Sequence, residues 1–270
     1  MENDPCLRNI KLVISYDGTR YHGWQRQAGA ASIQETIEQA AGRLLGHPVA
    51  CNGASRTDAG VHALGQVGNI RTGNFHIPVR NFRRALNAKL PPDIAVLSAE
   101  EVPPDFHASR GALGKTYRYR IYLAPHKLVM EAWHVYHYSH GQGKELDAEA
   151  MRQAAGRLVG THDFRGLAFA AEKRENTVRT ITQCTVSEAE DELRVWVTGD
   201  GFLYKMVRNI VGTLVEIGRG RWGPERIDDI LRTRDRAYAG QTAPASGLCL
   251  MAVYYSTLAS GRANETPTGM

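Results

Sequence analysis

The segment GASRTDAGVHALGQV, residues 53–67, places an arginine and an aspartate in a turn that leads into a predicted strand. Small residues flank Arg56 and Asp58 on both sides, so the backbone can turn sharply and no bulky neighbour covers the carboxylate. Asp58 is therefore a candidate catalytic residue. An Asx-turn or a cap is the alternative interpretation of an isolated Asp-Ala-Gly, so the rest of the chain must decide between them.

The residues around this segment predict the order β-α-β-β-α-β. Residues 10–16 alternate between apolar and polar, the pattern of a half-buried strand, and a capping box at Ser32 opens an amphipathic helix that ends at Gly46. A short strand over 49–52 precedes the turn, and a longer one over 61–70 follows it. Pro78 opens a second helix, and residues 94–97 begin a further strand. This order is that of a ferredoxin-like half.

A similar order recurs after the Pro103-Pro104 break. The predicted elements are a strand over 116–123, a helix capped by Asp147, a strand pair over 180–188 and 193–198, a helix over 206–217, a short helix opened by Pro224 and a strand over 248–255. No repeat is detectable in the sequence itself, so the duplication is one of architecture.

These elements predict an α+β fold of two ferredoxin-like halves, residues 1–104 and 105–255. We expect the halves to join into one extended antiparallel sheet with helices on one face, a groove on the other, and an active-site cleft between the halves. Residues 256–270 are short, polar and rich in glycine and proline, which predicts a disordered tail.

Composition favours a polyanionic partner. The 270 residues carry 33 Lys and Arg against 28 Asp and Glu, a formal charge of +5 with a pI near 9.1. The four cysteines are scattered without finger-like spacing, which predicts reduced thiols. The N-terminus is polar and acidic, and no apolar run approaches the ~20 residues of a membrane span, so we expect a soluble cytoplasmic protein.

Two further residues bear on Asp58. Alternation along residues 115–122 places Tyr117 on the opposite face from Arg118, although a strand tyrosine is usually a core residue. Arg208 stands inside an otherwise apolar helix, and a buried guanidinium without a partner is very costly, so it needs a carboxylate such as Asp58.

Other arginines are candidates for RNA contact. Arg26 lies in a loop of aromatic, amide and basic groups, residues 21–27, that can stack on bases or simply anchor to the core through its tryptophan. Arg80, Arg83 and Arg84 form the basic face of the second helix, which either tracks a phosphate backbone or is an ordinary solvated surface.

Metal and cofactor chemistry find little support in the sequence. Asp58 and His62 are four residues apart, but Gly60 between them argues against one helix presenting both, and two ligands do not make a zinc site. No Walker, dinucleotide, nucleophile-elbow or His-Glu-x-x-His motif is present. We therefore predict neither a metal nor a cofactor.

Five segments together resemble the TruA family of tRNA pseudouridine synthases. They are YDGTRYHGWQRQ (16–27), RTDAGVHA (56–63), KTYRY (115–119), GFLYKMVRNIVG (201–212) and APASGL (243–248), in the family's order within a likeness that spans residues 9–255. The resemblance implies isomerisation of uridine to pseudouridine in the anticodon stem-loop of tRNA, near positions 38 to 40, by a homodimer without metal or cofactor.

The same resemblance assigns roles to residues. Asp58 would be the catalytic carboxylate and Arg208 its ion partner, while Arg56 would assist entry of the flipped base and Tyr117 would pack on the target uracil. Leu248 would help to wall the pocket. Attack of the carboxylate on the sugar and attack on the base both remain open.

Two other classes of function are alternatives to an isomerase. They are an RNA-binding or chaperone module and a metal-assisted nuclease or hydrolase.

Overall fold

The computed structural model describes residues 7–138 and 145–255. The predicted tail, residues 256–270, and Cys6 lie outside these ranges. Of the other cysteines, Cys51 and Cys184 are buried free thiols and Cys249 is partly buried.

The first half contains two helices and four strands. Its elements are β1 (Arg8–Tyr16), α1 (Ile33–Leu45), β2 (Cys51–Gly53), β3 (His62–Thr72), α2 (Val79–Asn87) and β4 (Ile94–Val102). The predicted cap is present, because Ser32 accepts a hydrogen bond from the Glu35 backbone N–H at 3.3 Å and Gly46 ends α1 in the left-handed conformation.

The second half repeats this order with insertions. Its elements are β5 (Ala112–Tyr122), β6 (Tyr136–His137), α3 (Ala148–Arg157), β7 (Gly160–Asp163), β8 (Val178–Ala189), β9 (Glu192–Gly199), α4 (Met206–Gly218), α5 (Arg226–Thr233) and β10 (Leu248–Tyr255), with single 3₁₀ turns at 165–167, 236–238 and 245–247. Asp147 caps α3 by accepting from the Ala150 N–H at 2.9 Å. The short β6 and the polar edge strand β7 were not predicted from the sequence.

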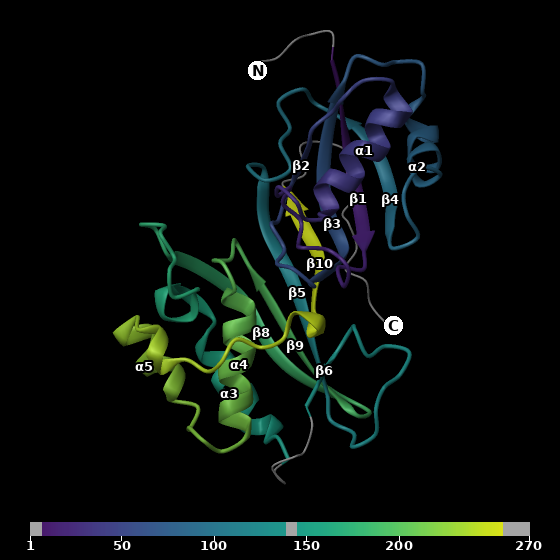
Figure 1. The fold of residues 1–270 in the computed structure, drawn as a ribbon. Helices are drawn as coiled ribbons and strands as arrows, with labels where there is room; N and C mark the ends of the chain where they lie inside the picture. The colour runs from purple at the N-terminus through teal and green to yellow at the C-terminus, as the bar shows by residue number, and fades with distance from the viewer. Residues whose placement is uncertain (1–6, 139–144, 256–270) are drawn as a thin grey trace.

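The strands form one ten-stranded, mostly antiparallel sheet in the order β4-β1-β3-β10-β5-β9-β8-β7, with β2 also on β3 and β6 also on β5. The order β4-β1-β3-β2 in the first half matches β10-β5-β9-β8 in the second. The two halves are thus the same ferredoxin-like arrangement, and the predicted fold class is confirmed. Figure 1 shows α1 and α2 at one end of the sheet and α3, α4 and α5 at the other.

The halves meet where β10 enters between β3 and β5. The β10–β3 pairing is parallel and short, with Cys249 opposite His62 and Leu250 opposite Ala63, whereas β10 pairs with β5 over most of its length. The far end of β3 pairs with β2 instead. Because the Asp58 turn directly precedes β3, this topology brings it beside the start of β10.

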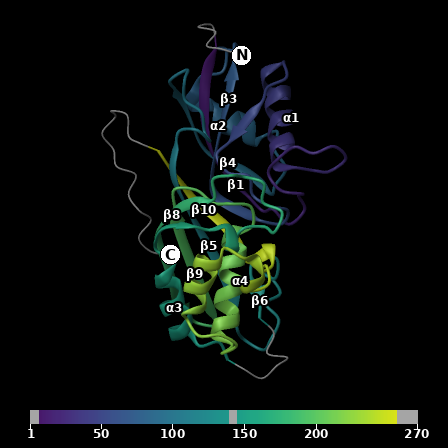
Figure 2. The ribbon, with the colours of Figure 1, turned by 90° about the vertical axis from the view of Figure 1, so that its left-hand side faces the viewer.

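One register row shows that the helices of both halves cover the same face. Tyr16 pairs with Ala63, Ala63 with Leu250, Leu250 with Tyr117, and Tyr117 with Val197. Directly paired residues point to the same side of a sheet, and all five belong to a single apolar core that also includes buried residues of α1, α2, α3 and α4. Figure 2 shows the ribbon from the side, with α1 beside the strands of the first half and α3 and α4 beside those of the second. Among the described residues, no helix combines the length and the apolar composition that a membrane span requires.

Candidate active site

The Asp58 turn is held by backbone contacts with the loop that follows β1. The Trp24 N–H donates to the Thr57 carbonyl at 3.0 Å, and the Gly60 N–H donates to the Tyr21 carbonyl at 3.2 Å. Gly23 permits this approach, because its φ is +91° and a Cβ there would lie 2.6 Å from the Thr57 carbonyl oxygen. The two loops therefore support each other.

Trp24 anchors its loop to the core. Its side chain is 2% exposed, and a Cβ added at Gly53 would lie 2.2 Å from the indole ring. Of the two roles open for this tryptophan, the structure favours core packing over base stacking, since a buried ring offers no free face.

A buried polar network fixes the residues on either side of Arg56. Gln66 accepts from the Ser55 N–H at 3.1 Å and donates to the Ser55 carbonyl at 2.7 Å. Thr57 shares a hydrogen bond with the Tyr16 hydroxyl at 2.8 Å. Because these groups are satisfied without water, the backbone that carries Asp58 is rigidly placed.

Asp58 and Arg208 form an ion pair between the two halves. Arg208 Nη1 lies 2.9 Å from Asp58 Oδ2, and Arg208 Nε donates to the Ala243 carbonyl at 2.7 Å. The arginine and aspartate side chains are only 15% and 12% exposed. Arg208 lies in the first turn of α4, which begins after Lys205 in the left-handed conformation (φ +59°). The structure thus contains the pairing expected from a charged residue in an apolar helix.

Tyr117 faces Asp58's turn from β5. Its hydroxyl shares a hydrogen bond with Ser55 Oγ at 2.7 Å, and its ring packs edge-on against Phe202 with centroids 5.2 Å apart. Burial raises the pKa of Tyr117 to about 12, with a further upward contribution from the Asp58 carboxylate. The ring is therefore a neutral wall.

Replacing Ser55 with alanine tests this contact. The change is expected to destabilise the protein by about 1–3 kcal/mol, because the buried Tyr117 hydroxyl loses its partner. The double variant with Ser55→Ala and Tyr117→Phe should lose less unfolding free energy than the two single variants lose in sum. Urea unfolding of the four proteins measures the coupling, and strict additivity would show that the hydrogen bond contributes nothing to stability.

A cleft of about 930 Å³ contains all five residues proposed for catalysis and base binding. Asp58, Arg56, Tyr117, Arg208 and Leu248 all line it. The cleft lies at the seam between the halves. It opens on the helix-bearing face of the sheet, because Tyr117 belongs to that face and residues at the starts of α1 and α4 line the cleft. The cleft expected between the halves is thus present, and a groove on the opposite face stays a prediction.

Several lining residues were not predicted as site residues. They are Ser55, Lys115, Arg174, Phe202 and Lys205. Lys115 and Phe202 lie within the family-like segments, and the same-face spacing of Lys115 and Tyr117 was a usable signal. Arg174 lies in a segment without periodic pattern, and no feature of the sequence indicates its position.

The four other candidate arginines do not line this cleft, although Arg26 lies between two residues that do, Gln25 and Gln27. Arg26 is exposed and pairs with Glu38 of α1. Arg80, Arg83 and Arg84 are exposed on α2, and Arg83 donates to the Leu97 carbonyl at 3.4 Å. Their contact with RNA stays a prediction.

Salt dependence tests the arginines of α2. The logarithm of the tRNA binding constant falls linearly with the logarithm of the salt concentration. If Arg80 and Arg83 each contact a phosphate, replacing either with alanine should make this negative slope shallower by about one. Fluorescence titration at several salt concentrations measures this slope. Arg232→Ala on α5 is the control, because Arg232 is equally exposed and already pairs with Asp229. Equal slopes for all variants would leave α2 outside the interface.

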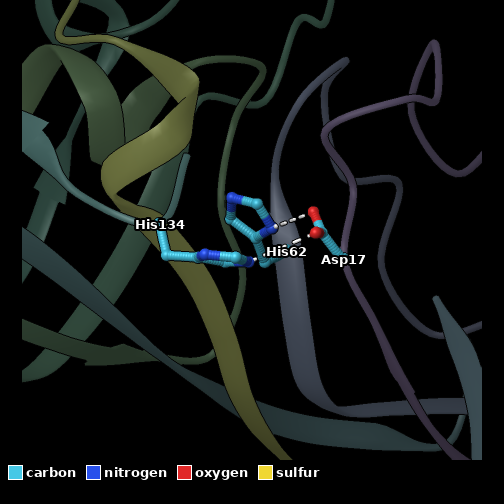
Figure 3. A group of neighbouring side chains, drawn as sticks. All are labelled: Asp17, His62 and His134. Carbon is cyan, nitrogen blue, oxygen red and sulfur yellow. Dashed lines mark ion pairs between the residues drawn. The ribbon is translucent and has the colours of Figure 1, made fainter. Parts of the chain in front are cut away.

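His62 is occupied by a different network. Its Nδ1 accepts from the Gly18 N–H at 3.1 Å, and its Nε2 contacts the Trp133 carbonyl at 2.9 Å, so Nε2 carries the proton. Asp17 and His134 complete the one group of three possible metal ligands found in residues 7–138 and 145–255, with ligand atoms within 4.8 Å of one another (Figure 3). Burial, followed by the neighbouring His134, lowers the pKa of His62. Both ring nitrogens of His62 already have protein partners.

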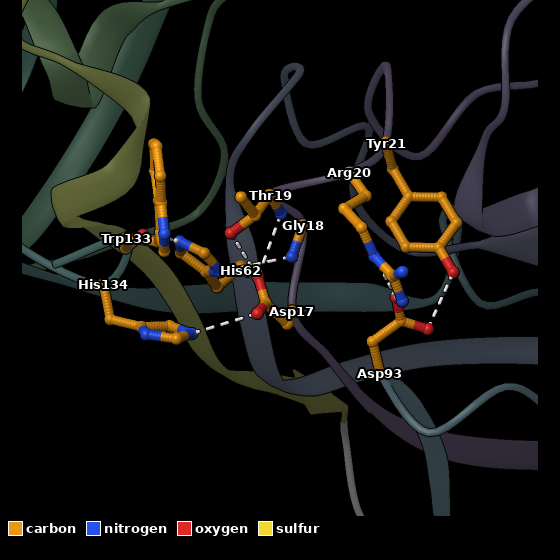
Figure 4. Close-up of polar contacts among 9 residues, drawn as sticks. All are labelled: Asp17, Gly18, Thr19, Arg20, Tyr21, His62, Asp93, Trp133 and His134. Carbon is orange, nitrogen blue, oxygen red and sulfur yellow. Dashed lines mark hydrogen bonds and ion pairs between the residues drawn. The ribbon is translucent and has the colours of Figure 1, made fainter. Parts of the chain in front are cut away.

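The network around His62 fixes the entry to β3. Figure 4 shows the Asp17 loop meeting the segment of Trp133 and His134, while Tyr21 on the same loop donates from its hydroxyl to Asp93 at 2.8 Å. These contacts join the end of β1 to the start of β3 and to the second half. They support the Asp58 turn mechanically rather than placing a histidine against the carboxylate.

Comparison with known proteins identifies the family. A family model described as tRNA pseudouridine synthase matches residues 12–109 and 154–256, which together are most of the chain. The chain belongs to the tRNA pseudouridine synthase family. The tRNA pseudouridine synthase A of Acetivibrio thermocellus is 47% identical over 249 residues, which cover 92% of this chain and all of that protein. The tRNA pseudouridine synthase A 2 of Clostridium perfringens is 43% identical over the same extent. Members of the tRNA pseudouridine synthase family thus align with both halves and with the cleft between them.

Proposed function

We propose that this tRNA pseudouridine synthase isomerises uridine to pseudouridine in the anticodon stem-loop of tRNA, near positions 38 to 40, with Asp58 as the catalytic carboxylate. Family membership makes the chain an isomerase that acts on tRNA. The observation that carries the role of Asp58 is its ion pair with Arg208 at 2.9 Å, inside a cleft formed by both halves.

The reaction breaks the bond between N1 of uracil and C1′ of ribose and forms a bond between C5 and C1′. The proton on C5 is lost and N1 gains one, so the product has the mass of the substrate. A carboxylate serves as nucleophile in such chemistry if it is charged and accessible. Arg208 supplies the compensating charge, and its second bond, to the Ala243 carbonyl, fixes the orientation of the guanidinium.

The released uracil must turn without leaving. Tyr117 and Leu248, which are 6% and 5% exposed, supply apolar walls on adjacent strands, and Phe202 packs edge-on against the tyrosine. The target base reaches this pocket by flipping out of its stack, at a cost of a few kcal/mol that phosphate contacts offset. Arg56 is exposed at the cleft wall, which suits a role in guiding the flipped base.

Mapping of pseudouridine on a tRNA transcript tests the proposal. Unmodified tRNA incubated with the protein should give new carbodiimide-dependent primer-extension stops at positions 38 to 40. Stops at other uridines would correct the site on tRNA but keep the activity. Intact RNA without any stop would overturn the proposed activity, and cut RNA would indicate a nuclease.

A homodimer is part of the same proposal. It would let one tRNA contact two copies of the cleft surface. Light scattering coupled to gel filtration should then give twice the chain mass of 29.8 kDa.

A further inference from the structure

Lys115 lies in the wall of the cleft, and it has no acidic partner among the residues that the structure describes. It lies two residues before Tyr117 on β5, so its side chain leaves the sheet on the same face as the tyrosine, about 7 Å along the strand. The residue is half-buried. No ion pair within residues 7–138 and 145–255 includes it.

The surroundings of Lys115 disfavour its charge. Burial lowers the pKa of the Lys115 ammonium, and the guanidinium groups of Arg174 and Arg179 lower it further. A half-buried cation beside two other cations costs stability in the free protein. Such an arrangement is typical of binding sites in which a ligand supplies the compensating negative charge.

The cleft as a whole lacks negative charge. Among the described residues, its lining carries five cationic side chains and one carboxylate, namely Arg56, Lys115, Arg174, Lys205 and Arg208 against Asp58. Asp58 is already paired with Arg208. Little anionic charge is therefore left within the cleft for the remaining cations.

Arg174 stands on the same side of the cleft as Lys115. Its Nη1 donates to the Phe202 carbonyl at 3.4 Å, and the ring of Phe202 is the one that packs on Tyr117. Its Nε lies 3.5 Å from Glu172, a long contact that leaves donors of the guanidinium available. Arg174 is half exposed, so it can approach a ligand that Lys115 reaches from the cleft wall.

We propose that Lys115 and Arg174 bind one backbone phosphate of the RNA, in a linkage that flanks the nucleotide whose base contacts Tyr117. This inference rests on the proposed function. A phosphate there supplies the negative charge that the cleft lacks. The lysine contributes a compact point charge and the arginine its planar donors, the two ways in which proteins hold phosphate. A base and the phosphate next to it are separated by a span comparable to that between Tyr117 and Lys115.

The variant Lys115→Met separates binding from folding, because methionine keeps the apolar stem and removes the charge. It is expected to bind tRNA about tenfold more weakly. The negative slope of log K against log salt should also become shallower by about 0.9, the value for one neutralised phosphate. Its midpoint of thermal unfolding should rise, because an unpaired, half-buried cation is gone. Lys127→Met is the matched control at an exposed lysine outside the cleft and should change neither quantity.

Replacing one charged phosphate of the RNA with a neutral methylphosphonate shows which phosphate Lys115 contacts. Two anticodon stem-loop RNAs, each with one methylphosphonate on the 5′ or the 3′ side of the target uridine, are bound to wild type and to Lys115→Met. One of them should weaken the wild type about tenfold and leave the variant unchanged.

Three results would overturn the assignment. They are equal binding of tRNA by Lys115→Met and wild type, a lowered unfolding midpoint, and equal sensitivity of both proteins to each neutral linkage. If wild type forms pseudouridine while any of these holds, only the phosphate site is wrong. If wild type forms none on the fully charged RNA, the proposed function and this site fall together.

Discussion

Asp58→Asn is expected to lower the rate of pseudouridine formation by a factor on the order of 10³ or more, the size of loss seen when a catalytic nucleophile is removed. Asparagine keeps the shape of the side chain but carries no charge and is a poor nucleophile. Binding of tRNA should persist, because the cleft loses its one carboxylate and becomes more positive. Single-turnover assays on unmodified tRNA, with saturating enzyme, measure the chemical step apart from binding.

Asp228→Asn is the matched control for that experiment. Asp228 is also an aspartate paired with an arginine, Arg157, but both side chains are about half exposed on the outer helices. Its replacement should leave the rate within twofold of wild type. A rate for Asp58→Asn close to that of the control would remove Asp58 from the chemistry and favour a module that only binds RNA.

Arg208→Ala is expected to reduce both stability and activity. Removing one partner of a buried ion pair costs about 3–5 kcal/mol, and the partial exposure of this pair places the expected loss nearer 2–3 kcal/mol. The rate should fall about 100-fold, because Asp58 loses the group that orients it. Arg208→Lys keeps the charge but loses the bond to the Ala243 carbonyl, so intermediate values are expected. Urea unfolding and single-turnover rates give the two quantities.

A double-mutant cycle between Asp58 and Arg208 isolates their interaction. Combining Asp58→Asn with Arg208→Ala should cost clearly less stability than the sum of the single changes. The exposed pair Arg157 and Asp228 gives the reference cycle, for which a coupling of about 0–1 kcal/mol is expected. Equal coupling in both cycles would mean that the ion pair across the seam is energetically ordinary.

Local signals in the sequence predicted most elements because each signal acts within a few residues. Ser32 and Asp147 bond to the first turns of their own helices, and Gly46 ends α1 by adopting a conformation that few other residues tolerate. The hairpin between β8 and β9 turns at Glu190, whose φ is +50°. The contact of Arg208 with Asp58 was predictable for a different reason, since an apolar helix cannot leave a guanidinium unpaired.

Features that depend on the assembled sheet were not accessible in this way. The parallel pairing of β10 with β3 involves two residue pairs, too few to leave a pattern. The two-residue β6 is equally short, and β7 is polar because it lies at the edge. The open side of the seam depends on where α1 and α4 begin relative to each other, which is a property of both halves together.

The placement of β10 makes the cleft depend on a strand that comes late in the chain. This strand lies between β3 and β5 and brings Leu248 into the cleft, so without β10 the facing edges of β3 and β5 have no neighbour. A protein truncated before Leu248 is therefore expected to lack one wall of the cleft and to expose strand edges that favour aggregation.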